Sequence, residues 1–179
     1  MSLHAEALAA LAGWSAPDDE QRALQASYVD HLNANPDGVM RTCHPDHITA
    51  STLVVSPDRQ QVLLNLHRRY HIWCQFGGHC EDEDESLRSA ALREAVEESG
   101  IADLRLVSDQ LVQLSCHEVR CGPQRPSHHL DVRYVAEAPA STPPRVSDES
   151  LEVRWFGCDE VPESVDAPLR ALIRLAARV

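Results

Sequence analysis

The chain has 179 residues, of which 43% are hydrophobic and 25% are charged, a composition typical of one globular domain with its own core. Its formal net charge of -12 argues against nucleic acid polymers and membrane surfaces as partners, because both select for basic protein surfaces. The charge does not exclude small phosphate substrates, since a divalent cation can bridge acidic side chains to phosphate oxygens.

The N-terminal part of the chain, residues 1–38, has the pattern of a helical hairpin. The apolar stripe of its first helix consists of Leu3, Ala7, Leu11 and Trp14, which recur at helical spacing. The second helix is expected to start after Pro17, where acidic residues complement the helix dipole, and to end at the turn residues 36–38. We expect this extension to pack on a domain formed by residues 39–179 or to serve oligomerisation, in which case the protein would be a homodimer.

The remaining elements follow from residue patterns. We expect strands over residues 47–56, 61–67, 104–119, 128–138 and 152–156. We expect helices over residues 86–99 and 165–179. Strands and helices do not alternate regularly, so the sequence predicts an α/β (α+β) sandwich with a mixed sheet and helices on both faces.

The helix over 86–99 carries carboxylates where its periodicity predicts core. At 100° per residue, Glu94 and Glu98 lie on an otherwise apolar stripe, with Glu97 beside them. Their spacing lets the three carboxylates converge, and grouping them there is costly unless a cation neutralises them. Oxygen ligands of this kind suit Mg²⁺ or Mn²⁺. The alternative is a solvated acidic face with an ordinary Arg93–Glu97 ion pair; the stripe geometry and the glycines before the helix favour metal binding.

The segment GHCEDEDESLRSAALREAVEESGI, residues 78–101, resembles the Nudix box. The family pattern is G-x5-E-x7-R-E-U-x-E-E-x-G-U, where U is a bulky aliphatic residue, and residues 93–101 fit its second half at every fixed letter. The resemblance implies a Nudix-like α/β/α sandwich and a metal-dependent hydrolase. Its substrate would be a small molecule joined to a nucleoside through a diphosphate linkage, which the enzyme cleaves.

Two positions depart from the family pattern. Five residues after Gly78 lead to Asp84, whereas seven residues before Arg93 lead to Glu85, so the loop holds one extra residue and either acid can fill the first acidic position. We expect the extra residue to form a local excursion that leaves Glu85 in register with the helix, because a polar loop absorbs an insertion at little cost. Ala95 stands where a larger aliphatic residue is usual, which concerns packing and not chemistry.

The resemblance also implies roles for individual residues. The implied metal ligands are Glu94, Glu97, Glu98 and a backbone carbonyl of Gly77 or Gly78. The implied catalytic residues are Glu94, Glu98 and Glu149. Some members of the family use a general base that matches Glu94, and others use a glutamate on a late loop, for which Glu149 is the candidate. Simple loop solubility explains Glu149 equally well.

Four further residues are candidates for substrate binding: Arg68, Arg69, His79 and Arg133. The two neighbouring arginines can hold a phosphate, although a solvated basic turn accounts for them as well. His79 follows the glycines directly and is well placed to touch a ligand. Arg133 can line a pocket or belong to a cross-strand polar cluster with His129 and Asp131.

The cysteines and histidines do not predict a second metal site. The candidate zinc ligands are Cys116, His117, Cys121, His128 and His129, but their spacing matches no compact zinc pattern. His44 and His47 are interpreted as loop and strand-start residues. The six cysteines form no C-x-x-C pair and are interpreted as reduced thiols. Together with the absence of a targeting or transmembrane pattern, they indicate a cytoplasmic protein.

Two other functions compete with hydrolysis. An isomerase of the isopentenyl diphosphate type is similar in length and acidic site but needs a reactive cysteine, for which Cys74 and Cys80 flank the glycines. A non-catalytic Nudix-like sensor would be expected to lack some of the box acids, which this chain retains. Subfamilies that act on ADP-ribose or on dinucleoside polyphosphates carry a proline or a tyrosine downstream of the box. Residues 103–119 contain neither, so neither substrate is favoured.

Overall fold

A computed structural model describes residues 1–119, 123–140 and 142–179. Its helices are α1 (Leu3–Gly13), α2 (Asp19–Ala34), α3 (Leu87–Ser99) and α4 (Ala167–Ala176). Its strands are β1 (His47–Val55), β2 (Gln61–His67), β3 (Trp73–Cys74), β4 (Phe76–His79), β5 (Arg105–Leu106), β6 (Gln113–Val119), β7 (Ser127–Glu137) and β8 (Ser150–Gly157). The expected mixed sheet, the expected helices and the helical hairpin are therefore confirmed.

The expected single strand over 104–119 is wrong, because two strands, β5 and β6, occupy it. The chain leaves the β7 edge between them, with Val107 and Val112 each still donating a backbone hydrogen bond to β7. Three of the four intervening residues are polar, and one of them, Asp109, forms an ion pair of 2.7 Å with Arg88 of α3. This outward turn toward α3 interrupts the strand.

Strand β1 is the centre of the sheet and is buried along its whole length. One edge of β1 pairs with β7 in parallel, from His47 opposite His129 to Val55 opposite Glu137. The other edge is shared: β4 pairs antiparallel with its first half and β2 with its end. β6 and β5 pair with β7, and β8 and β3 pair with β2. The glycines of β4 are thereby fixed beside the central strand.

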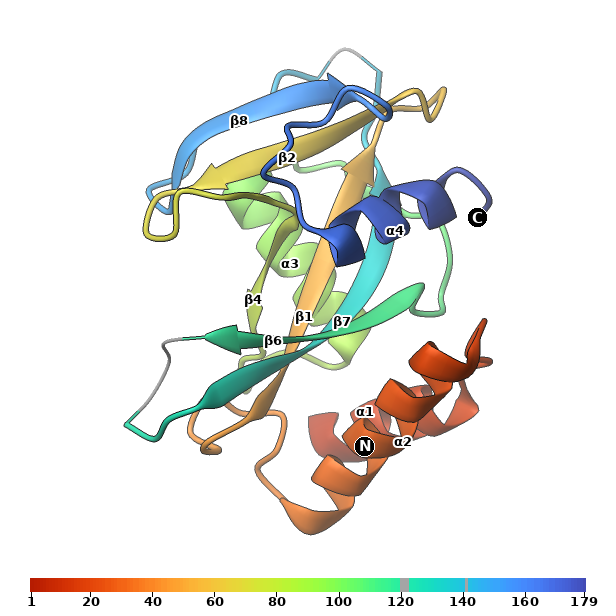
Figure 1. Ribbon diagram of the computed structural model, residues 1–179, viewed down its shortest axis with the longest axis vertical. Coiled ribbons are helices and arrows are strands. Elements are labelled where there is room, and N and C mark those ends of the chain that lie inside the picture. The colour runs from red at the N-terminus through yellow and green to blue at the C-terminus, as the bar shows by residue number, and fades with distance from the viewer. Residues whose placement is uncertain (120–122, 141) are drawn as a thin grey trace.

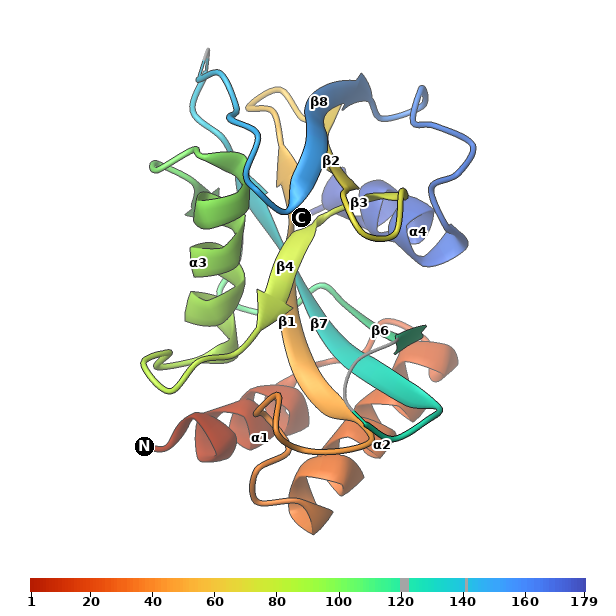
Figure 2. The ribbon, with the colours of Figure 1, turned by 90° about the vertical axis from the view of Figure 1, so that its left-hand side faces the viewer.

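The helices cover both faces of this sheet, as Figure 2 shows with α3 and α4 on opposite sides of the strands. One core cluster joins α3 to β1, β2 and β7 around Phe76 and Ala95. Another joins α4 to the opposite face around Leu53 and Leu172. The N-terminal hairpin packs against the lower end of the sheet in Figure 1 through a third cluster that includes Tyr28. This is an α/β/α sandwich with an added helical layer.

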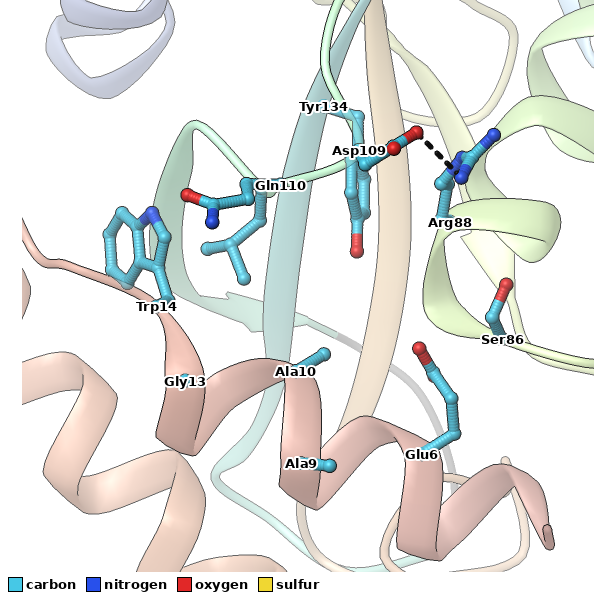
Figure 3. Close-up of a pocket in the computed structure, with 11 residues that line it drawn as sticks. Glu6, Ala9, Ala10, Gly13, Trp14, Ser86, Arg88, Asp109, Gln110 and Tyr134 are labelled. Carbon is cyan, nitrogen blue, oxygen red and sulfur yellow. Dashed lines mark ion pairs between the residues drawn. The ribbon is translucent and has the colours of Figure 1, made fainter.

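Two polar side chains of the hairpin, Gln21 and Glu6, form three hydrogen bonds with the domain. The side-chain amide of Gln21 donates to the Leu114 carbonyl at 3.0 Å and accepts from the Leu114 amide at 2.7 Å. The Glu6 carboxylate accepts from the amide of Leu87, the first residue of α3, at 3.0 Å. Glu6 also lines a pocket of about 330 Å³ between α1 and the start of α3, drawn in Figure 3 with the Arg88–Asp109 ion pair at its rim.

No helix in the described part of the chain is long and apolar enough to cross a membrane. The five cysteines that the structure describes are Cys43, Cys74, Cys80, Cys116 and Cys158, and all of them are free thiols. Cys121, one of the candidate zinc ligands, lies outside the described residues.

Candidate active site

Helix α3 is fixed at both ends, so its acidic residues have a defined orientation. Ser86 and Ser89 form a reciprocal capping box at the N-terminus. Gly100 closes the C-terminus in the left-handed conformation at φ 69°, which favours glycine. In the middle, the Thr52 hydroxyl of β1 donates to the Ala91 carbonyl at 2.9 Å. These contacts hold one face of α3 against β1 and β4.

Glu98 is the most deeply placed acid of this face, with 7% of its surface exposed. The backbone amide of Gly77 donates to its Oε2 at 2.8 Å. Burial raises the pKa of Glu98 to about 8, against the opposing effect of the Gly77 hydrogen bond, and the charges of Glu94 and Glu149 raise it further. One hydrogen bond does not offset the cost of this buried charge.

Glu94 lies one turn earlier and touches the other glycine of β4. A Cβ atom at Gly78 would lie 2.6 Å from the Glu94 Oε1, so only glycine allows this close approach. Burial raises the pKa of Glu94 to about 7, and the charges of Glu97 and Glu149 add to the increase. Glu97 itself keeps 60% of its side chain exposed.

Arg93 is the cation that the structure places among these acids. Its guanidinium lies 2.9 Å from Asp84, 3.2 Å from Glu94 and 3.5 Å from Glu97. It also donates to the His79 carbonyl at 3.0 Å. Arg93 thereby joins the acidic loop, the glycine strand and the helix. The Arg93–Glu97 ion pair is present, and Glu94 and Glu98 still face inward.

Of the two candidate loop acids, Asp84 is buried and accepts from Arg93, whereas Glu85 is exposed. Asp84 accepts two hydrogen bonds from Arg93 and one from the Glu81 amide. The extra residue therefore lies between Asp84 and the helix cap. The turn closed by the Glu81 contact brings the shorter side chain within reach of Arg93, and spacing alone did not reveal this.

The late loop brings the charge of Glu149 to the same site. Glu149 is exposed, yet its charge raises the pKa of both Glu94 and Glu98. The loop is anchored to β2: the Arg68 amide donates to the Glu149 carbonyl at 2.9 Å, and the Arg68 guanidinium donates to the carbonyls of Asp148 and Ser150. Arg68, expected to hold a substrate phosphate, is engaged in holding this loop.

The other candidate substrate residues lie in different surroundings. Arg133 is 3% exposed, donates to Asp131 at 2.8 Å and to Gln113 at 3.1 Å, and so belongs to a buried cross-strand cluster. The Arg69 guanidinium lies over the ring of Tyr70, 5.5 Å from its centroid. His79 packs against the rings of His47 and His129.

The cross-strand polar cluster of Arg133 and Asp131 was one of the two interpretations of the sequence, but its extension to β1 and to Gln75 was missed. The Asp131 carboxylate also accepts hydrogen bonds from Thr49, Ser51 and Gln75. The signal was a run of polar residues at every second position from His47 to Ser51. Two cavities lie away from the α3 glutamates. One lies beside α1, and the other lies between α2, β6 and α4.

The carboxylates of α3 have the donor chemistry that a hard divalent cation requires. The two buried carboxylates, Glu94 and Glu98, have raised pKa values and face the backbone of the glycine strand. A third acid, Glu97, directly precedes Glu98 in α3. A cation of the Mg²⁺ or Mn²⁺ type would relieve the cost of their burial. The residues present therefore fit such an ion.

An acidic helix packed against a glycine strand, inside an α/β/α sandwich, forms a site at which a divalent cation could bind phosphate groups. The model of the NUDIX domain matches residues 45–176, so the chain belongs to the NUDIX family. This confirms the prediction of a Nudix hydrolase.

Solved structures share this fold at low sequence identity. The Ap4A hydrolase of C. elegans in a binary complex has a TM-score of 0.62 and 17% identity over 73% of this chain and 95% of that chain. The dihydroneopterin triphosphate pyrophosphohydrolase of E. coli has a TM-score of 0.61 and 19% identity over 74% of this chain and 96% of that chain. The NUDIX domain of Shewanella oneidensis NrtR complexed with ADP ribose has a TM-score of 0.58 and 19% identity over 86% of this chain and 96% of that chain. No curated protein sequence matches this chain significantly.

Proposed function

We propose that the protein is a divalent-metal-dependent hydrolase that cleaves a diphosphate linkage in a small molecule linked to a nucleoside diphosphate. The observation that carries the proposal is the burial of Glu94 and Glu98 against the backbone of Gly77 and Gly78, with the pKa of both acids raised. Such a site is costly without a cation and suited to one. A cation held there can bind a diphosphate.

The ligands of this cation would be Glu94, Glu97 and Glu98, with a carbonyl of the glycine strand. When bound, Mg²⁺ or Mn²⁺ neutralises diphosphate charge and lowers the pKa of water. The protein's own part is to hold these acids on a helix fixed by caps and to keep Arg93 beside them. This preorganisation lowers the cost of reaching the transition state.

Glu149 is our candidate for the general base that takes a proton from the attacking water. Its charge is close enough to raise the pKa of both buried acids, and its exposed position lets it meet a substrate from the solvent side. Arg68 would act as a positioning residue through its three hydrogen bonds to the loop. Glu94 is the alternative base.

The two thiols beside the glycines, Cys74 and Cys80, argue against the isomerase alternative. Burial raises the pKa of Cys74 to about 12, helped by the charge of Glu98, and burial likewise raises the pKa of Cys80 to about 12. Both cysteines are therefore protonated at neutral pH and lack the thiolate that gives a cysteine its reactivity. A sensor function would not need the retained acids.

The substrate class follows from the family, and the neighbours suggest where to begin. One neighbour is an Ap4A hydrolase and another was solved with ADP ribose, so a dinucleoside polyphosphate and a nucleoside diphosphate sugar belong in a first panel. We also propose that residues 39–179 form the catalytic domain, with 1–38 as an extension that packs on it. A cytoplasmic location and a homodimer remain further proposals.

The proposal is tested by phosphate release from a substrate panel with Mg²⁺, with Mn²⁺ and with chelator. The phosphate monoesters that the cleavage releases are then hydrolysed by a phosphatase before phosphate is measured, so that cleavage of a diphosphate linkage gives a signal. We expect turnover of at least one diphosphate compound that requires the cation and falls by orders of magnitude in Glu98→Gln. The matched control is Glu20→Gln, an exposed helical glutamate of α2. Full activity of Glu98→Gln, or equal activity in chelator, would refute the proposal.

A further inference from the structure

Three histidines meet on the sheet face that looks away from α3. His79 ends β4, His47 begins β1, and His129 lies on β7 directly opposite His47. Their ring centroids are 5.1 Å, 5.0 Å and 5.1 Å apart in the three pairs. Each comes from a different strand, so the pairing of the sheet alone assembles the group.

The nitrogens of this triangle already have the separation of a metal site. One ligand atom from each ring lies within 4.8 Å of the other two, and among the described residues no other group of three or more His, Cys, Asp or Glu was found so arranged. In a tetrahedral zinc site with Zn–N bonds of about 2.1 Å, ligand nitrogens are about 3.4 Å apart. Small side-chain rotations would close the difference.

His47 has the hydrogen bonding of a metal ligand. Its Nδ1 lies 3.2 Å from the Cys43 carbonyl, which can only accept, so Nδ1 carries the proton and Nε2 presents a lone pair. Ligating histidines are commonly oriented by such a bond from the second ring nitrogen to a backbone carbonyl. The side chain is fully buried, at 0% exposure, and its Nε2 has no hydrogen-bond partner.

His129, on the neighbouring strand, also has a buried Nε2 without a hydrogen-bond partner. An unsatisfied buried nitrogen costs free energy, and two of them face one small space. Burial lowers the pKa of His47 and lowers that of His129 to about 3, so both imidazoles are neutral, as metal ligation requires. His79 and His129 are only partly buried, which leaves the group open to an ion from solvent.

We propose that His47, His79 and His129 form a binding site for a transition-metal ion of the zinc class. Imidazole nitrogens select such ions over Mg²⁺, which prefers oxygen. Three protein ligands leave a fourth position open for water or a substrate group. His117, whose ring centroid is 5.5 Å from that of His129, stands next to this opening.

This histidine site is separate from the acidic centre. In β4 the side of Gly78 faces Glu94 of α3, and alternation along a strand directs the next side chain, His79, to the opposite face. Only β4 separates the two sites, so an ion on the histidines would stiffen the strand whose backbone contacts Glu98. The proposal does not depend on the proposed hydrolase activity.

The test measures binding of zinc to the whole chain after treatment with chelator and dialysis. Zn²⁺ affinity is obtained by competition with a chromophoric chelator, and Co²⁺ replaces zinc to give a visible ligand-field spectrum. We expect one ion per chain, bound about 100-fold more weakly in His129→Gln and in His79→Gln. The matched control is His128→Gln, the preceding residue of β7, which contacts Asp46 instead of the triangle; it should keep the parent affinity.

Circular dichroism shows whether each variant is folded, and the two ligand variants lie on different strands, so one misfolded variant does not decide the test. The proposal is overturned if the parent protein fails to bind zinc stoichiometrically. It is also overturned if folded His129→Gln or His79→Gln binds zinc as tightly as the parent. Loss of binding in Glu98→Gln alone would assign the ion to the acidic centre and would equally refute the histidine site.

Discussion

Burial of the Glu98 carboxylate has a measurable consequence for the metal-free protein. Its folded-state pKa of about 8 lies above the ordinary value of 4.5, so the folded state holds a proton that the unfolded chain releases. Stability is therefore fully present below about pH 4.5 and is lost as the pH rises toward 8. Within this window one such group changes the free energy of unfolding by up to about 1.4 kcal/mol per pH unit.

The substitution Glu98→Gln removes this titration while keeping the shape of the side chain. In chelator, chemical unfolding of the parent protein and of the variant at half-unit steps from pH 5 to pH 9 should give curves that diverge. The variant should become the more stable of the two as the pH rises, and Mg²⁺ should restore the parent protein at pH 8 and not the variant. Parallel curves for the two proteins would refute the reasoning.

Three further substitutions test individual contacts. Asp84→Asn should lower the free energy of unfolding by roughly 1 to 2 kcal/mol, because Arg93 loses the shortest of its carboxylate contacts and keeps those with Glu94 and Glu97, whereas Glu85→Gln should have almost no effect; equal losses in chemical unfolding would contradict the assignment of the inner acid. Glu149→Gln should lower kcat by about 10²- to 10⁴-fold at an unchanged metal midpoint; an unaltered pH–rate profile would leave the late loop without a role in proton transfer. Gly78→Ala should displace the Glu94 carboxylate, which would be only 2.6 Å from the new methyl group, and should weaken metal binding in a calorimetric titration; parent-like affinity would mean that this close approach is unimportant.

The sequence predicted the helices and the acidic stripe because both depend on local periodicity. Glu94 and Glu98 could be placed on one face from their spacing, and the caps of α3 could be expected from Ser86 and Gly100. The break between β5 and β6 was missed, although Ser108, Asp109 and Gln110 are turn-forming polar residues and the Ser108 hydroxyl accepts a hydrogen bond from the Gln110 amide.

Two other features, the inner acid and the histidines, depend on tertiary structure. Spacing to Arg93 favoured Glu85, but the direction of a side chain after a tight turn depends on the turn itself, and Asp84 faces inward. His47 and His129 are far apart in sequence and become neighbours only through the parallel register of β1 and β7. Sequence spacing searches for metal sites cannot find ligands that three separate strands contribute.

The two hydrogen bonds from Gln21 to Leu114 have a consequence for attempts to shorten the protein. β6 pairs with β7 along one side, and the amide of Gln21 satisfies backbone groups on its other side as a neighbouring strand would. A fragment starting at residue 39 would expose this edge, and exposed edges invite strand addition by a second molecule. Oligomers or aggregates of such a fragment would then show that the edge is uncovered. The helical extension would in that case protect the edge of β6 from pairing with another chain.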